Sequence, residues 1–295
     1  MKNKIHYLLA GLLSSCSPAP AAYDATGTFE AIETIVSADA SGTIKAFDIE
    51  EGVTLKKGQI VGYIDSTQLH LKKKQLHAQI RAVLSKKPDA SKQLSALYAQ
   101  LSHARNEQKR VGNLLKLDAA TQKQYDDATS QVAVIERQIE GQESSLAITT
   151  GSLSEEALPL KAQIDQLNDQ LAKCKIVNEV NGTVLVKYAE QYETTTAGKP
   201  LYKIANLGTI ILRAYLTSDQ LSHATINQSV NVFVDAKGGS RKEYPGTISW
   251  ISDQAEFTPK TIQTRDERAN LVYACKIRVK NDGYIKIGMY GEIKL

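Results

Sequence analysis

Three side chains near the middle of the chain have types and spacing suited to surface recognition. Arg110, Leu114 and Thr121 follow the pattern R-x3-L-x6-T, beside a predicted turn at residues 117–121. The sequence shows no nucleophile, base and oxyanion arrangement, no phosphate-binding glycine loop and no metal-ligating cluster. The chemistry is therefore that of surfaces, and we expect no enzymatic activity, no cofactor and no metal site.

Each of the three side chains also has a purely structural explanation. Thr121 and Gln124 have the spacing of a capping box, in which the hydroxyl accepts an otherwise unpaired N–H group at the start of a helix. Leu114 could pack at the end of a hairpin, and Arg110 could lie on a helix surface. A recognition role for the three together is implied by the resemblance of the whole chain to a known family, and their position at the turn of a long hairpin strengthens that match.

A fourth candidate for chemistry is the thiol of Cys16. Lys2 and Lys4 precede a short apolar run at 7–13, which is too short to span a bilayer. The run ends in Leu-Ser-Ser-Cys, which resembles a bacterial lipobox and implies cleavage before Cys16 and lipidation of its thiol. We expect a signal peptide at 1–15 and a lipidated tether at 16–27. An ordinary signal peptide with an incidental cysteine stays open.

The remaining chemically versatile residues predict no further site. Cys174 and Cys275 fall in segments assigned to different modules, which favours two buried free thiols over a disulfide. His70 and His77 are seven residues apart, too far to share a metal ion along a helix, and we expect both to be solvated. The net charge of +4 is spread along the chain without a dense basic block, so nucleic-acid binding is not expected.

The element that must position the tip motif is the stretch 66–172. Its apolar residues recur at steps of three and four, which predicts a long antiparallel coiled-coil hairpin with a narrow seam. Pro88 should break the outbound arm at 85–89, and Gly151 should cap a helix end at 149–154 in the return arm. Breaks at nearly equal distances from the turn predict a jointed hairpin.

Glycine-punctuated β segments flank the hairpin at 28–65 and 173–205. They resemble the two halves of a biotinyl/lipoyl domain, although Asn178 and Glu179 stand where that pattern has Ala-Pro. A prosthetic-group carrier would present its modified lysine where the helices begin, which disfavours that function. Residues 206–295 form several short strands with turn signals between them, which predicts a small β-barrel with a short helix near 218–221.

Taken together, these elements resemble the HlyD-like periplasmic adaptor (membrane fusion protein) family, from about Thr26 to Leu295. A polar segment at 255–266 is similar to one in the YbhG-like branch, which accompanies ABC exporters. The resemblance implies an α+β multidomain fold: a lipoyl-like β domain, split by the coiled-coil hairpin and followed by a small β-barrel. It also implies that Arg110, Leu114 and Thr121 dock onto a TolC-like outer-membrane channel.

The function implied by this resemblance is that of a lipid-anchored periplasmic adaptor. Its partners would be the outer-membrane channel, an inner-membrane ABC-type exporter and further copies of itself, in a hexamer. The anchor would hold it to a membrane, with the inner membrane favoured. Alternatives are an adaptor of a proton-driven pump or of a type I protein secretion system, a lipoyl or biotin carrier subunit, and a coiled-coil scaffold without a transport role.

Overall fold

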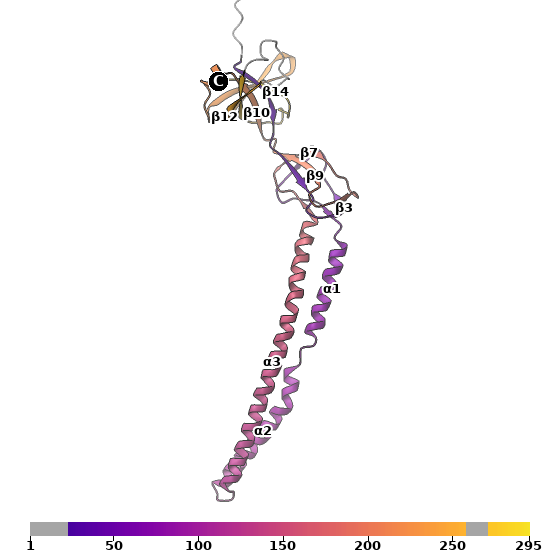
Figure 1. Ribbon diagram of the computed structural model, residues 1–295, viewed down its shortest axis with the longest axis vertical. Helices are drawn as coiled ribbons and strands as arrows, with labels where there is room; N and C mark the ends of the chain where they lie inside the picture. The colour runs from indigo at the N-terminus through magenta and orange to yellow at the C-terminus, as the bar shows by residue number, and fades with distance from the viewer. Residues whose placement is uncertain (1–22, 258–270) are drawn as a thin grey trace, which may run out of the picture.

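The computed structural model describes residues 23–257 and 271–295, and it is elongated (Figure 1). A β-barrel, a second β domain and a helical hairpin follow one another along the long axis. The helices are α1 (Thr67–Leu84), α2 (Ala90–Leu115), α3 (Gln122–Lys173) and the short α4 (Ser218–Leu221), with a 3-10 turn at Lys237–Gly239. The strands are β1 (Ala25–Glu30), β2 (Glu33–Ser37), β3 (Gly42–Phe47), β4 (Thr54–Leu55), β5 (Ile60–Ile64), β6 (Lys175–Val177), β7 (Gly182–Lys187), β8 (Thr194–Thr195), β9 (Pro200–Ala205), β10 (Thr209–Leu216), β11 (Ser229–Asp235), β12 (Arg241–Phe257), β13 (Leu271–Lys280) and β14 (Tyr290–Lys294).

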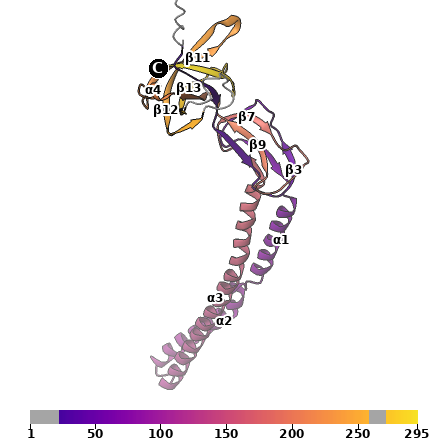
Figure 2. The same ribbon diagram turned by 45° about the horizontal axis from the view of Figure 1, so that its top comes forward.

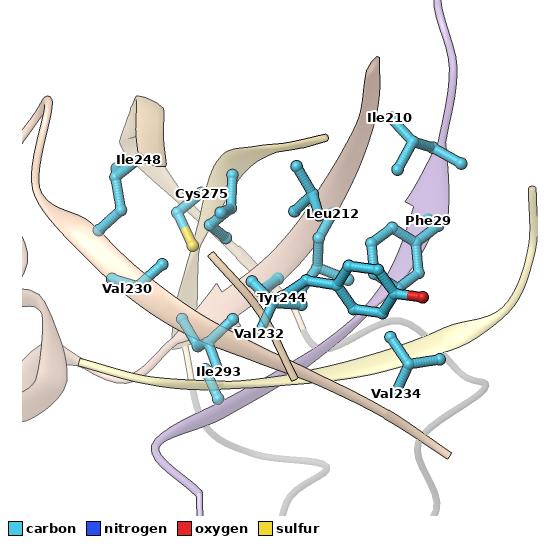
Figure 3. Packing of buried hydrophobic residues seen from close by; sticks show 14 of the residues in the cluster. Phe29, Ile210, Leu212, Val230, Val232, Val234, Tyr244, Ile248, Cys275 and Ile293 are labelled. Carbon is cyan, nitrogen blue, oxygen red and sulfur yellow. The ribbon is translucent and has the colours of Figure 1, made fainter. Parts of the chain in front are cut away.

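Six strands close the barrel in the order β1-β10-β13-β12-β11-β14. Strand β1 pairs antiparallel with both β10 and β14, so the first described strand and the last one lie side by side. The interior is filled by fully buried aliphatic side chains and Phe29, with the thiol of Cys275 among them (Figure 3). Burial of this apolar surface is the main term that stabilises such a small barrel.

The barrel corrects two expectations about the N-terminal part. Residues 28–65 were all assigned to the lipoyl-like domain, but residues 28–30 belong to β1 of the barrel, and the first strand of the next domain is β2. Residues 25–27 of the predicted tether at 16–27 also belong to β1. Alternation of apolar residues shows that a segment is extended, but it carries no information on which sheet the segment joins.

The second β domain is built from chain segments on both sides of the hairpin. Its two four-stranded sheets have the orders β2-β9-β7-β4 and β6-β5-β3-β8, so each sheet takes two strands from each half. One apolar core, which includes Cys174 and Tyr202, lies between them. This is the split lipoyl-like arrangement expected from the sequence.

Asn178 explains the departure from the Ala-Pro pattern. Its side chain is completely buried, and its amide donates to the carbonyl oxygens of Lys56, at 2.9 Å, and Val180. Its Oδ1 accepts from the Tyr202 hydroxyl at 3.0 Å, and its backbone N–H donates to the carbonyl of Gln59 at 2.8 Å. A buried amide costs stability unless its groups are paired, and here the pairing joins the two halves of the domain.

The outbound arm of the hairpin breaks where Pro88 predicted. Helix α1 ends at Leu84, and α2 begins after Asp89, whose carboxylate accepts from the Lys92 N–H at 3.2 Å as an N-cap. Pro88 directly precedes this cap, where its missing N–H and its restriction of the preceding residue end a helix.

The return arm is unbroken, so the predicted joint at Gly151 is wrong. Helix α3 continues through that position, and a proline that drew no expectation, Pro159, also lies inside it. The hydroxyls of Thr149 and Ser154 donate to the carbonyls of Ser145 and Thr150 at 2.9 Å, which keeps them paired within the helix. A glycine costs a helix only about 1 kcal/mol, and the buried contacts on either side outweigh that cost.

Those contacts form the apolar seam between α3 and the two outbound helices. Helix α3 runs alongside α1 and α2 along the hairpin (Figures 1 and 2). In the tip half, Leu94 and Leu101 of α2 pack with Ile139 and Leu146 of α3, among others. In the base half, Leu76 of α1 packs with Ile164 and Leu167. Within the described ranges, no helix has both the length and the apolar character needed to cross a bilayer.

The unbroken return helix makes a testable prediction. Replacing Gly151 with Ala should raise the free energy of unfolding by about 0.5–1 kcal/mol, because Gly151 is helical and a Cβ there meets no atom within 4 Å. Urea unfolding of the purified protein measures this. Gly58→Ala is a control with the opposite expected effect. Gly58 has a φ of +82°, so this substitution should lower the free energy of unfolding of the protein. A loss of stability in Gly151→Ala would instead indicate a helix end at that position.

Candidate docking tip of the helical hairpin

The turn between α2 and α3 has a defined structure. The N–H of Ala119 donates to the carbonyl of Leu114 at 2.9 Å, and the N–H of Asp118 donates to that of Leu115 at 3.1 Å. Asp118 has a φ of +53°. This bond pair with a left-handed residue is a Schellman motif, which satisfies carbonyl groups that a helix end leaves unpaired. The tip is therefore a fixed turn.

Leu117 is the most prominent apolar side chain of this turn. It is 76% exposed, immediately before the left-handed Asp118. The tip motif did not single out Leu117 as a site residue, because its spacing counts only Arg110, Leu114 and Thr121. One sequence signal could have identified Leu117 as a site residue. It is a leucine outside the seam spacing, at the start of the predicted turn.

Arg110 projects from α2 and is held by an acidic neighbour on the same helix. Its Nε donates to Glu107 Oε2 at 2.9 Å and its second amino group donates to Oε1 at 2.5 Å, so the guanidinium is bound bidentately. The pairing lowers the pKa of Glu107 and raises that of Arg110, in each case chiefly through these hydrogen bonds. The Arg110 side chain is largely exposed and that of Glu107 partly exposed, so the guanidinium has further donors free for a partner.

Leu114 is half-buried, and it also supports the turn through its backbone. Its carbonyl accepts from both Leu117 and Ala119, at 3.1 and 2.9 Å. It stands one helical turn after Arg110, so the two side chains lie on the same side of α2. Packing at the tip, which is the structural explanation of Leu114, buries part of its side chain. The exposed part remains available for docking.

Thr121 is the N-cap of α3, in the capping box expected from the sequence. Its Oγ1 accepts from the N–H of Gln124 at 3.3 Å, while Gln124 Oε1 accepts from the N–H of Thr121 at 2.8 Å. The structural explanation of Thr121 is thus confirmed. A direct role in docking stays a prediction, because the hydroxyl already serves the helix start.

The three motif residues are gathered at the hairpin end farthest from the barrel (Figure 1). Among the described residues, no hydrogen bond links their side chains to one another, so they form a surface rather than a polar network. The helices meet closely behind them: a Cβ on Gly112 would lie 3.1 Å from the ring of Tyr125. Gln108 also donates to the Thr129 hydroxyl at 3.0 Å across the seam.

The other candidate residues form no second site in the described part of the chain. Cys16 and most of the 255–266 segment lie outside the described residues. Cys174 and Cys275 are buried free thiols in separate cores, as expected, and burial raises the pKa of Cys275 to about 12. In residues 23–257 and 271–295, no group of His, Cys, Asp and Glu could hold a metal ion.

No protein-family model matches the chain. It is 25% identical over 274 residues to a UPF0194 membrane protein of Enterobacter sp. (strain 638), covering 86% of this chain and 82% of that protein. The UPF0194 membrane protein YbhG of Salmonella gallinarum (strain 287/91 / NCTC 13346) is 25% identical over 280 residues, covering 88% and 84%.

Comparison with solved structures shows which proteins share this architecture. MacA from Actinobacillus actinomycetemcomitans superposes with a TM-score of 0.54 at 19% identity, covering 91% of this chain and 76% of MacA. The periplasmic adaptor protein EmrA superposes with a TM-score of 0.50 at 16% identity, covering 92% and 97%. The fold is that of a periplasmic adaptor, or membrane fusion protein. The expected resemblance to periplasmic adaptors is confirmed at the level of the fold, as is the α+β multidomain class.

The capping box makes a prediction about the tip. Thr121→Ala should destabilise the start of α3 by about 1 kcal/mol, because the N–H of Gln124 loses its acceptor. Hydrogen exchange at Gln124 and Tyr125 should accelerate, while exchange at the seam near Ile139 stays unchanged. Thr121→Ser keeps the acceptor and serves as the matched control. Equal exchange in the alanine and serine variants would contradict the capping role.

Proposed function

We propose that the protein is a periplasmic adaptor that links an inner-membrane exporter to an outer-membrane channel for efflux or secretion. The observation that carries the proposal is the exposed tip of Arg110, Leu114 and Leu117, set at the far end of a stiff hairpin. Helix α3 alone has 52 residues, about 78 Å at 1.5 Å per residue. A surface held so far from the body suits a partner in a distant layer of the cell envelope.

The route of the chain supports an orientation with the barrel toward the anchored membrane. Thr26 pairs with Tyr215 near the end of β10, and Thr209 at the start of β10 follows the β domain. The chain therefore enters the barrel at the end away from the hairpin. Seven residues from Cys16 to Ala22 could span about 25 Å when extended, so a lipidated Cys16 would keep this end near the membrane surface.

The finer parts of the proposal rest on the sequence resemblance. An ABC-type exporter is favoured by the likeness of residues 255–266 to the YbhG-like branch, and a hexameric ring is the assembly that the family implies. Adaptors of proton-driven pumps or of type I secretion systems share the architecture and remain the alternatives. A carrier subunit is disfavoured, because β5 and β6 are joined by the long hairpin where a carrier would present its lysine.

Charge reversal at the tip tests docking. Arg110→Asp combined with Leu114→Asp should reduce capture of an outer-membrane channel at least tenfold, because the variant loses a donor and apolar area and gains two negative charges. The measurement is crosslinking in cells from a photoreactive residue at Leu117, with the captured protein identified by mass. Thermal unfolding checks that the hairpin still folds.

The matched control is Lys109→Asp, which makes the same charge change as Arg110→Asp at the next position of α2. Lys109 is exposed and pairs with no acidic group in the described residues. It points to another side of the helix, so capture should persist. Capture that survives the Arg110 and Leu114 changes, or fails equally with Lys109→Asp, would show that the tip assignment is wrong.

Lipidation makes a separate prediction. Cys16→Ala should remove the acyl anchor and shift the protein from the membrane fraction to the soluble periplasmic fraction in cells that lack its exporter. Labelled palmitate incorporation followed by fractionation measures both effects, and Ser17→Ala is the neighbouring control. Unchanged labelling of the Cys16→Ala protein would contradict the lipobox.

A further inference from the structure

The outer wall of the barrel has a groove that crosses strands β10, β13 and β12. The groove lies at the end of the barrel next to the β domain, because its lining begins at Gly208, in the link from β9 to β10. Its volume is about 490 Å³, and small-molecule sites typically have volumes of about 300–1,000 Å³. The side chains in its lining that can donate hydrogen bonds include Thr209, Asn227, Thr247, Arg278 and Lys280.

The pairing of the strands brings these side chains together. Thr209 of β10 lies opposite Lys280 of β13, and Thr247 of β12 lies opposite Arg278 of β13. Arg278 and Lys280 are two residues apart in one strand, so their side chains point to the same face of the sheet. Both are exposed, whereas Val279 between them is buried in the barrel core. Two cations and two hydroxyls therefore share one patch of the outer wall.

Two further cations on this face of the barrel are already paired with acids. The guanidinium of Arg213 donates to the Glu256 carboxylate at 3.2 Å, and the ammonium of Lys276 lies 3.1 Å from a carboxylate oxygen of Glu30. These pairs join neighbouring strands of the wall, so the two cations serve the barrel itself.

The cations of the groove have no such partner. Within residues 23–257 and 271–295, neither Arg278 nor Lys280 forms an ion pair, and no Asp or Glu side chain lines the groove. Two acids lie just beyond Lys280 in the strand register. Asp282 is occupied by Lys242, at 2.5 Å, and Glu243 is exposed outside the groove. The groove is thus a positively charged recess.

Hydrogen bonds fix two sides of this recess. The N–H of Asn281 donates to the carbonyl of Gly208 at 3.0 Å, and its side-chain amide donates to that of Leu207 at 3.0 Å. On the β12 side, the N–H of Asn227 donates to the carbonyl of Ile248 at 2.8 Å. Asn227 has a φ of +70°, a conformation that Asn adopts more readily than most side chains. Because the walls are already ordered, binding costs little conformational entropy.

The number and charge of the donor groups favour one class of ligand. Two cations match a phosphate monoester, which has a charge of about −1.5 to −2 at neutral pH and three strong acceptor oxygens. A carboxylate has two oxygens and a single negative charge, so it would leave donors of the groove unused. A phosphate diester, as in the headgroups of membrane lipids, also has a single negative charge.

We propose that the groove binds the phosphate group of a small, soluble phosphate monoester. Arg278 donates to two phosphate oxygens through its planar fork of N–H groups, and Lys280 supplies the second positive charge. The hydroxyls of Thr209 and Thr247 and the amide of Asn227 donate to the remaining lone pairs. This inference goes beyond the proposed adaptor function and does not rest on it, because it uses only side chains of the barrel domain.

Calorimetric titration of the purified full-length protein with phenyl phosphate tests the site, at low salt and in a buffer without phosphate. We expect saturable binding, and binding about fivefold weaker for Arg278→Gln or Lys280→Gln, since each variant loses a charge-assisted hydrogen bond at an exposed site. Lys294→Gln is the matched control. Lys294 is an exposed lysine of β14, which stands opposite β13 in the six-stranded barrel, and its loss should leave the affinity unchanged.

A negative charge placed in the groove provides a second test. Asn227→Asp keeps the size of the side chain and tolerates the left-handed backbone, but it should weaken phenyl phosphate binding about tenfold through repulsion. Asn231→Asp makes the same change on the exposed face of β11, outside the groove, and should leave the affinity unchanged. Thermal unfolding checks that both variants keep the fold.

Three further probes distinguish the classes of ligand: inorganic phosphate, benzoate and vesicles that contain phosphatidylglycerol. We expect inorganic phosphate to compete with phenyl phosphate, and benzoate to bind about tenfold more weakly because it has a single negative charge. Retention of the protein on the vesicles should be the same for the unchanged protein and for Arg278→Gln combined with Lys280→Gln.

Several results would overturn the proposal. Absence of saturable binding at millimolar phenyl phosphate would overturn the site, and so would equal weakening by Lys294→Gln, because net charge alone would then explain the effect. Benzoate that binds as tightly as phenyl phosphate would overturn the assignment to phosphate monoesters. Loss of vesicle retention in the variant with both Arg278 and Lys280 replaced would instead assign the groove to lipid headgroups.

Discussion

The apolar seam between α3 and the two outbound helices is the interaction on which the reach of this molecule depends. Residues such as Leu101, Ile139 and Ile164 are almost fully buried, although the surrounding surfaces are polar. Isolated helices of this composition are only marginally stable in water, so each arm depends on burying its stripe against the other. Because the seam is narrow, most of the surface of each helix stays exposed.

The seam can act over this length only because the β domain holds both arms at their base. Each of its two sheets takes two strands from either side of the hairpin, and Asn178 joins the halves through buried hydrogen bonds. The barrel repeats this nesting, since β1 pairs with β14. The first and last described strands thus meet at one pole of the molecule and the tip lies at the other, which is the geometry that the proposed bridging role requires.

Much of the candidate site could be predicted from local sequence. The capping box of Thr121 and Gln124 depends on residues three apart, and the position of the turn follows from where the seam spacing stops. The sequence did not predict the bidentate pair of Arg110 with Glu107. Several charged residues on an exposed helix could pair with Arg110, and the side-chain rotamers decide which of them does. The prominence of Leu117 depends on the left-handed Asp118, which spacing alone does not reveal.

The sequence by itself determined the features that local chemistry decides: the helical period of the hairpin, the break at Pro88, the cap at Thr121 and the strand-forming segments on both sides. The tertiary structure decided which partner each segment takes. It divided residues 28–36 between two domains, and it carried α3 through Gly151 because packing against α1 and α2 outweighs a weak local preference. Proline costs a helix interior about 3 kcal/mol and glycine about 1 kcal/mol. The packing of α3 offsets both Gly151 and Pro159, which lie inside it, whereas α1 ends before Pro88.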